Sequence, residues 1–419
     1  MTPTARNTPP MMAALAILAI LAGASPLSAQ EACSANSEWL VPGRVVDRMT
    51  TLTGSQDWKI SKPQIATMIE HSRKLMDVVL KIEEIAKPVG FQVGWARAVG
   101  DAEPGHFTLV DQPYPLRVEA MIFGFACPGG IVKRRWTDAD AGVSISMNSA
   151  AEILNNTNAT VRGQPVYALS LDLGTFRGHR LFMPATASPK DRAYYTRFAL
   201  VARPGRSPFT YVTKDEFFDH LAGELDKNEP IETARAASAV RVRPKAEQEE
   251  AIKRRIKEIE GYNISESARQ ARIKRVLADA KSDEQLRDEA VARSTTSFAK
   301  MRARLQAMRS GLSAAQLLEP ASIQAGTSTH YALLASEEWS FVNPVIDTSC
   351  YPGCTFGQYL VTLNRDYFDW SLPRTAPQLY VVGVGTLGLP EERSPSWRRI
   401  RDEALARIGL DALAETLPK

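Results

Sequence analysis

Residues 244–309 read PKAEQEEAIKRRIKEIEGYNISESARQARIKRVLADAKSDEQLRDEAVARSTTSFAKMRARLQAMR, and the rest of the chain is organised around this stretch. Its first apolar residues, Ile252, Ile256 and Ile259, recur every three or four positions, as residues on one face of an α-helix do. Two further apolar stripes of the same spacing follow. The stretch therefore predicts a series of helices, each with one narrow apolar face and a charged remainder.

Local start and stop signals divide this stretch into separate helices. Ser282 with Gln285, and Ser313 with Gln316, have the spacing of a capping box, in which the serine hydroxyl and the glutamine side chain satisfy free backbone N–H groups. Gly311 is a natural C-terminal stop. We therefore expect one helix to begin after Ser282 and to end near Gly311.

The helical stretch is more basic than the rest of the chain. It holds 16 Lys and Arg against 11 Asp and Glu, whereas the whole chain has a formal charge of +4, so the remainder sums to −1. A solvated helical hairpin with i,i+4 ion pairs, such as Glu249–Lys253 and Glu250–Arg254, accounts for this pattern. The alternative is a basic face for an anionic surface or an acidic partner. Because acidic residues are interleaved and aromatic residues are almost absent, nucleic acid is not the expected partner.

The first 29 residues have the pattern of a secretory signal peptide. Arg6 precedes the apolar run 12–22, and small residues precede an expected cleavage site after Ala29. The alternative is an uncleaved membrane anchor, but the run is too short for a permanent span. No later stretch is apolar enough to cross a membrane. We therefore expect a periplasmic or secreted protein with no integral membrane segment after cleavage.

The chain has four cysteines, and export would place them in an oxidising compartment. Pro and Gly between Cys350 and Cys354 predict a turn that brings these two residues within disulfide reach. Cys33 then pairs with Cys127 by elimination. A four-cysteine zinc site is the alternative, although the spacing lacks paired CxxC motifs.

The segment before the helices reads as one long helix followed by strands. Ser61, Pro63 and Gln64 form a helix start, and a wide apolar stripe predicts a helix over 63–86. Short runs between turn residues then predict strands at 91–97, 106–110, 116–126, 130–136, 142–147, 165–172, 179–183, 194–202 and 210–212, with a short helix at 149–154. The connections are short, which favours an antiparallel sheet. A capping box at Thr213 and Glu216 begins another helix, and 228–244 reads as a linker.

The segment after the helices returns to strands at 329–334, 359–364 and 378–385, and it ends with helices at 395–408 and 411–417. These three strands are too few for an independent sheet, so we expect them to rejoin the earlier one. Aromatic residues are dense over 331–380, and they either fill a core or form an exposed ligand platform. The predicted class is α+β, with a signal peptide at 1–29, a β-rich segment at 30–227, a linker and charged helical excursion at 228–320, and a closing segment at 321–419.

Few motifs indicate chemistry. Residues 383–388 match GxGxxG after a strand, but Pro390 and a charged loop stand where the nucleotide-binding helix should begin. The histidines lack metal-binding spacing, and no GxSxG nucleophile motif is present. Ser328 and His330 are two residues apart on an expected strand, which does not make a triad. We therefore expect no cofactor and no metal.

The sequence favours a non-catalytic, exported protein that binds another macromolecule, either an envelope protein or an anionic surface, through helices 245–310. The alternative is a periplasmic hydrolase whose site assembles from dispersed residues. Asp366 and Asp369 could act as paired carboxylates, although aspartate is equally at home in a turn. For the hydrolase, the first residues to test are His179, His330, Asp366 and Asp369.

Overall fold

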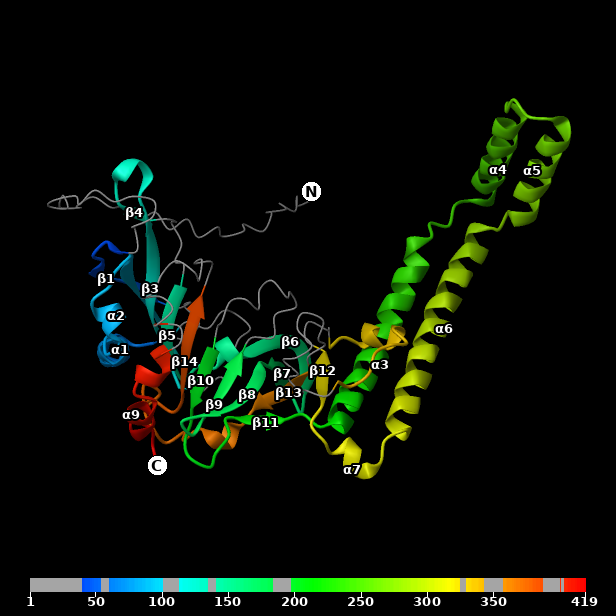
Figure 1. The fold of residues 1–419 in the computed structure, drawn as a ribbon. Coiled ribbons are helices and arrows are strands. Elements are labelled where there is room, and N and C mark those ends of the chain that lie inside the picture. Colours follow the sequence, from blue (N-terminus) through cyan, green and yellow to red (C-terminus); the bar gives the residue numbers. More distant parts are fainter. Residues whose placement is uncertain are drawn as a thin grey trace, which may run out of the picture.

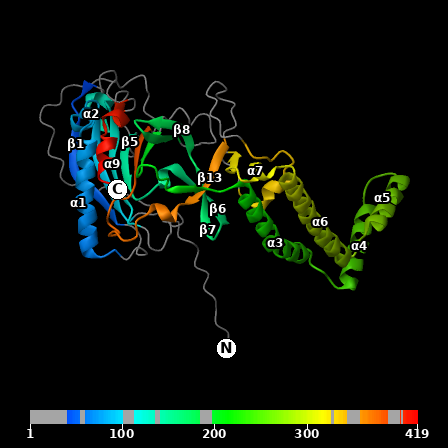
Figure 2. The ribbon, with the colours of Figure 1, turned by 90° about the horizontal axis from the view of Figure 1, so that it is seen from below.

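The computed structural model describes residues 40–53, 60–100, 113–134, 141–183, 197–324, 329–342, 357–386, 400 and 403–419. The chain has an α+β fold: a body built on mostly antiparallel sheets, from which a pair of long helices projects (Figures 1 and 2). This confirms the predicted class, with its N-terminal packing helix, its central charged excursion and its late strands that rejoin the body. The domain boundaries stay a prediction.

Within the described residues, nine strands form the larger sheet, in the order β1-β2-β3-β5-β14-β10-β9-β8, with β4 paired to β3. Their bounds are β1 (Arg44–Thr53), β2 (Phe91–Val99), β3 (Leu116–Ala126), β4 (Lys133–Arg134), β5 (Ala141–Met147), β8 (Leu171–Phe176), β9 (His179–Met183), β10 (Arg197–Val201) and β14 (Tyr380–Thr386). β1 runs parallel to β2, and the other neighbouring strands of this sheet are antiparallel among the described residues.

The smaller sheet has five strands among the described residues, in the order β11-β13-β7-β6, with β12 paired to β13. Their bounds are β6 (Leu154–Val161), β7 (Gln164–Leu169), β11 (Phe209–Tyr211), β12 (Ser322–Gln324) and β13 (Gly357–Leu363). Both sheets therefore combine strands from before and after the helices. β14 in particular lies between β5 and β10, in the interior of the larger sheet.

Helices cover one face of the larger sheet. α1 (Lys62–Val79) and α2 (Glu83–Ala86) share a core with this sheet, and so do Ile400, Ile408 and the C-terminal α9 (Leu410–Glu415). The predicted single helix over 63–86 is broken between α1 and α2. The break places Ile82 and Ile85 in the same core, where both are fully buried. Burial of these two side chains accounts for the bend.

Aromatic side chains fill the space between the two sheets. Phe182 and Phe198 from the larger sheet share a core with Tyr167 and Val361 from the smaller one, and Tyr367 and Phe368 join them. Tyr331, Trp339 and Tyr380 are also buried, whereas Trp370 is 40% exposed. The described aromatics of 331–380 therefore serve mainly as core.

The projecting helices are α3 (Lys214–Ala239), α4 (Lys245–Glu260), α5 (Glu266–Asp279) and α6 (Asp283–Ser310), and the short α7 (Ala314–Leu317) leads back to the body. Residues of α3 and α6 share a third core with the smaller sheet: Phe217, Phe218, Leu221, Leu225, Phe298, Met301, Leu305, Val166, Ala168 and Leu360. This core fastens the base of the two long helices to the body.

Several local predictions are confirmed, because they depend only on neighbouring residues. The capping boxes at Ser61, Thr213, Ser282 and Ser313 all form, each with the expected glutamine or glutamate. Residues 403–407 are helical, and Leu405 and Ile408 face the core as expected.

Other predictions are wrong because tertiary contacts override the local pattern. The expected linker is helical as far as Ala239, and α3 continues through Pro230 beside α6. The expected strand at 329–334 is instead a short 3-10 helix, Tyr331–Ala335, whose Tyr331, Leu333 and Leu334 pack against α3 and α6. The expected helix at 149–154 is only a 3-10 turn, Ala151–Ile153, before β6.

The sequence also underestimates the strands. β1, β6 and β12 were not expected, the run 165–172 divides into β7 and β8, and the strands form two sheets rather than one. The signal peptide, the expected strand at 106–110, Cys33, Cys350 and Cys354 lie outside the described residues. Cys127 follows the end of β3. Because the other three cysteines lie outside the described residues, both disulfide pairings stay predictions.

The core that joins the long helices to the body can be tested with two leucines of the same chain. We expect Leu305→Ala to destabilise the protein by about 2–5 kcal/mol, because Leu305 is buried and truncation leaves a cavity. Leu277→Ala is the matched control, since Leu277 is 56% exposed, and it should change stability by roughly 0.5 kcal/mol or less. Urea denaturation followed by circular dichroism measures both. Equal effects of the two substitutions would contradict the core assignment.

Candidate functional site

The feature most open to another molecule is the pair of long helices, which we call the arm (residues 214–310). Its lower part, the shaft, consists of α3 and α6. Its far end, the tip, consists of α4 and α5. Residues 240–244 and 280–282, which join the two parts, form the elbow. Figure 1 shows the arm standing away from the sheets, and Figure 2 shows the tip turned at an angle to the shaft.

Ion pairs hold the shaft together on its solvent side. α3 carries 7 Asp and Glu against 3 Lys and Arg, whereas α6 carries 6 Lys and Arg against 4 Asp and Glu. Arg302 of α6 pairs with Asp226 at 2.8 Å and also with Glu229, both on α3. Arg309 of α6 lies 2.6 Å from both Asp215 and Asp219. Two of the arginines that make this stretch basic are therefore neutralised by α3.

The tip has very little interior of its own. Ile259 is buried, Ile252, Ile256, Ile273 and Val276 are only partly buried, and no residue of α5 is buried. Helices of 16 and 14 residues are marginal in water without tertiary support. The direction and order of the tip therefore depend on its connection to the shaft.

Three side chains make that connection at the elbow. Arg243 donates to Asp283 from its backbone N at 3.0 Å, from Nε at 2.7 Å and from Nη2 at 2.8 Å. Gln248 of α4 donates to the Arg243 carbonyl at 2.6 Å and accepts from the Asp283 backbone N at 2.9 Å. The side chain of Asp283 is 5% exposed, so this ion pair is largely shielded on the acidic side. One residue from each of the elbow, α4 and α6 is thereby joined into a single network.

The network also fixes the ionisation of Asp283. Hydrogen bonds from the Arg243 side chain, and then from its backbone N–H, lower the pKa of Asp283 from 3.8 to about 2. A carboxylate that accepts several charge-assisted hydrogen bonds is strongly favoured over its protonated form. Asp283 is therefore ionised at neutral pH, where it can form its ion pair with Arg243. In the sequence, Arg243 lies in an expected linker and residues 282–285 have only the pattern of a helix cap. The contact between Arg243 and Asp283, which are 40 residues apart in the sequence, was therefore not predicted.

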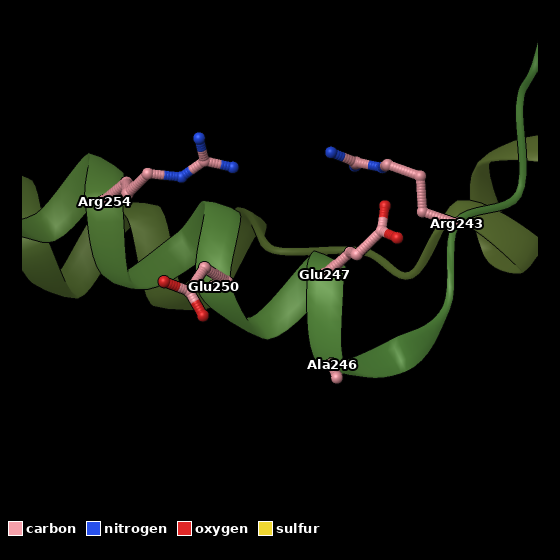
Figure 3. Close-up of a pocket in the computed structure, with 5 residues that line it drawn as sticks. All are labelled: Arg243, Ala246, Glu247, Glu250 and Arg254. Atoms are coloured by element: carbon pink, nitrogen blue, oxygen red, sulfur yellow. The ribbon is translucent and has the colours of Figure 1, made fainter.

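A concave surface lies beside the elbow, lined by Arg243, Ala246, Glu247, Glu250 and Arg254 (Figure 3). Figure 3 shows the guanidinium groups of Arg243 and Arg254 extending toward one another, with the carboxylate of Glu247 beneath the Arg243 side chain. The carboxylate of Glu250 points away from the guanidinium groups of Arg243 and Arg254. Among the described residues, the expected i,i+4 pairs Glu249–Lys253 and Glu250–Arg254 do not form, and Arg255 instead lies 3.4 Å from Glu258.

An open groove at the foot of the arm contains a histidine and a carboxylate. It lies between residues 158–162 of the smaller sheet and α3, with His220 and Glu224 among its lining residues. Arg162 on one wall pairs with Glu216 on the other at 2.8 Å. Nε2 of His330 is 4.0 Å from the Glu224 carboxylate, which is beyond hydrogen-bond distance. The groove presents polar groups that largely satisfy one another rather than an acid–base pair.

The other candidate catalytic residues are placed in separate parts of the body. His179 of β9 lies 3.4 Å from Asp411 of α9, which is exposed. Asp366 belongs to the 3-10 helix Arg365–Tyr367, and Asp369 accepts hydrogen bonds from the backbone N and hydroxyl of Ser371. The Ser371 hydroxyl and backbone lower the pKa of Asp369. The Asp369 carboxylate therefore stabilises a local turn, whereas Asp366 contributes only its backbone N–H, which donates to the Asn364 side chain at 3.1 Å. Within the described residues, neither aspartate forms a hydrogen bond or ion pair with His179 or His330.

One buried carboxyl was missed by the sequence reading. Glu152, on the 3-10 turn beneath β5, accepts a hydrogen bond from Ser146 and lies 3.8 Å from Arg117. Desolvation raises the pKa of Glu152 above 4.5, against the opposing effects of Arg117 and Ser146. Its Oε2 has no hydrogen-bond partner in the described structure, and solvent does not reach that atom. A ligand could not contact this oxygen unless the side chains around it rearranged.

The glycine motif at 383–388 also has a structural explanation. Gly383 lies on β14, which is antiparallel to both neighbours, whereas a dinucleotide loop follows a strand of a parallel sheet. A Cβ at Gly383 would lie 2.7 Å from the Phe198 ring. Close packing of that ring therefore requires glycine here.

The described residues contain no group of three or more His, Cys, Asp or Glu side chains arranged to hold a metal ion. None of their helices combines the length and apolar character needed to span a bilayer.

The chain has no match among protein-family models, curated proteins or solved structures.

The elbow network predicts a pH-sensitive joint. Because the pKa of Asp283 is lowered by folding, its contribution to stability is present above pH 3.8 and is lost as the pH falls through about 2. We expect Asp283→Asn to loosen the joint at neutral pH, since an amide cannot replace the carboxylate opposite Arg243.

Spin labels at Lys274 on the tip and Lys300 on the shaft would report the joint as a distance distribution. The distribution should be narrow for the otherwise unchanged chain at pH 7, and broad for Asp283→Asn at pH 7 or for the unchanged chain near pH 2. Asp279→Asn, an exposed acid near the end of α5, is the matched control. A distribution that stays narrow in Asp283→Asn would show that the network does not orient the tip.

Proposed function

We propose that this chain is an exported, non-catalytic protein that binds another macromolecule through its arm. The observation that carries the proposal is the position of the tip: a charged pair of helices, held away from the body and oriented by the elbow (Figure 1). Solvated helices gain little stability by standing apart from the body, so a binding role gives a reason for the arrangement.

Charge and composition favour a protein partner in the cell envelope. Residues 245–281, which comprise the tip and two adjoining residues of the elbow, have 10 Lys and Arg against 7 Asp and Glu, which is too mixed for a nucleic-acid surface. An anionic lipid surface would require an apolar face for insertion, but most large apolar residues of α4 and α5 are partly or fully buried, and Leu277 is the exposed exception. Export to the periplasm or beyond, with disulfides Cys33–Cys127 and Cys350–Cys354, belongs to the same proposal.

The binding role can be tested by removing the tip alone. Replacing residues 245–281 with a short Gly/Ser linker keeps Arg243, Asp283 and the buried base of the shaft. We expect this variant to lose partners that the unchanged protein captures from a cross-linked envelope fraction, while the body keeps its thermal stability. Lys133→Glu, an exposed charge change on the body, is the control and should retain them. Retention of every partner by the tipless variant would refute the proposal.

Export and disulfide formation have their own measurement. We expect the mature protein to begin at Gln30, and thiol titration of the denatured, unreduced protein to detect no free thiol. N-terminal sequencing and a chromogenic thiol assay measure these properties. A retained Met1, or two or more free thiols, would contradict this part of the proposal.

A further inference from the structure

One face of α4 carries an ordered series of charges. Glu247, Glu250, Arg254 and Lys257 are spaced by three, four and three residues, so they lie in a row along one side of the helix. All four are exposed. The row lies opposite the side formed by Gln248, Ile252, Ile256 and Ile259, which is turned toward the inside of the tip. From the elbow outward, the row reads acid, acid, base, base.

In the described part of the chain these four charges are largely unpartnered; the exception is the electrostatic effect of Glu247 on Arg243, whose pKa is raised first by Asp283 and then by Glu247. Among the residues that the structure describes, none forms a hydrogen bond or ion pair with any of these four side chains. Charges elsewhere on the arm do find partners, such as Arg255 with Glu258, Arg269 with Glu266, and Lys281 with Glu289. In Figure 3, Arg254 and Glu250 extend in different directions although their spacing would allow a pair. The row is therefore free to meet charges from outside.

We propose that two copies of this chain associate through this face, with α4 packed antiparallel to α4 of the second copy. A two-fold axis at the level of Ile252 places Glu250 opposite Arg254 of the second copy, and Glu247 opposite Lys257 of the second copy. The symmetry repeats both pairs, so the single row supplies four intermolecular ion pairs. An interface of this isologous kind is closed and gives a dimer rather than a fibre.

The order of the charges selects a second copy over other partners. A uniformly acidic surface would attract Arg254 and Lys257 but repel Glu247 and Glu250, and a uniformly basic surface would do the reverse. An antiparallel copy is complementary at every position. The face also lacks large apolar side chains, which disfavours insertion into a membrane.

The position of α4 makes the association sterically accessible. The tip is the part of the arm farthest from the sheets, as both views show (Figures 1 and 2). The concave surface beside Ala246 leaves room next to the row. Because the contacts are exposed ion pairs, the association is expected to be weak and to weaken further with salt.

This inference rests on the proposed role of the arm as a binding element, and it names the occupant of one face. The test is sedimentation velocity of the full mature chain over a range of concentrations, at low and at high ionic strength. We expect a monomer–dimer equilibrium at low salt that shifts to monomer at high salt. A monomer under all conditions would overturn the inference.

Charge exchange provides the sharper test. Arg254→Glu alone or Glu250→Arg alone turns two attractive contacts into repulsive ones, and should lower the association constant by roughly tenfold or more. The double variant Glu250→Arg/Arg254→Glu restores both contacts and should dimerise again. An equimolar mixture of the two single variants should form a heterodimer. Lys274→Glu on α5, an exposed charge outside the row, is the matched control and should dimerise like the unchanged chain.

The outcomes separate this inference from the proposed function. If the single variants dimerise like the unchanged chain, or if the double variant does not recover, the antiparallel α4 contact is wrong. If the chain stays monomeric but removal of the tip still releases an envelope partner, the inference fails and the proposed function stands. If the dimer forms as described and the tipless variant keeps all other partners, the inference stands and a different macromolecule is not the target of the tip.

Discussion

The whole arrangement depends on the apolar seam where Phe298, Met301 and Leu305 of α6 meet Phe218 and Leu221 of α3 over the smaller sheet. This seam holds the buried apolar side chains of both long helices within the described structure, and it lies in the half of each helix nearer the body, whereas the buried Asp283 lies at the far end of α6. Beside this seam the two helices are also joined by ion pairs of Arg302 and Arg309, and farther along the shaft the Thr233 and Ser294 hydroxyls are hydrogen-bonded. Buried apolar side chains therefore hold the arm on the body, and ion pairs help to fix the direction of its solvent-exposed part.

Three kinds of contact follow one another along the arm. The base is held by hydrophobic packing, the middle by Arg302 with Asp226 and Glu229, and the elbow by Arg243 with Asp283. In water, the ion pairs of the middle stabilise the arm less than the hydrophobic packing of the base. The ion pair at the elbow is an exception to this trend, because the Asp283 carboxylate is shielded from solvent. Arg243 donates hydrogen bonds to that carboxylate from both its backbone and its side chain. The elbow therefore fixes the direction of the tip and does not bury it. A mostly solvated tip can thus have a defined orientation.

The parts of this fold that could be predicted from sequence are those in which the residues that decide the structure are close together along the chain. The capping boxes at Thr213 and Ser282 satisfy their own helix ends, and the apolar spacing of α6 identifies its buried face. The extension of α3 past Pro230 could not be predicted in this way, because its partner α6 lies about 70 residues away in the sequence. The same reason applies to β14, which is placed between β5 and β10 by pairings with residues far upstream.

In the candidate site, too, local features could be predicted from the sequence and long-range contacts could not. Composition identified the charged helices, but it could not show that α3 neutralises two of their arginines or that the row on α4 remains unpaired. The dispersed residues considered for a hydrolase illustrate the opposite error. His179 lies beside Asp411, 232 residues away in the sequence, whereas the nearby Asp369 caps a local turn and Asp366 contributes only its backbone N–H to one. Proximity in sequence was a poor guide to chemistry here.

Small-angle X-ray scattering of the mature chain in solution tests the central claim most directly, because it measures how far mass extends from the body. A charged arm that stands away from the sheets gives a distance distribution with a long tail. Removing residues 245–281 should shorten the largest dimension by an amount on the order of 20 Å, the length of the 14-residue α5 at about 1.5 Å per residue. A compact profile that the deletion leaves unchanged would contradict the account.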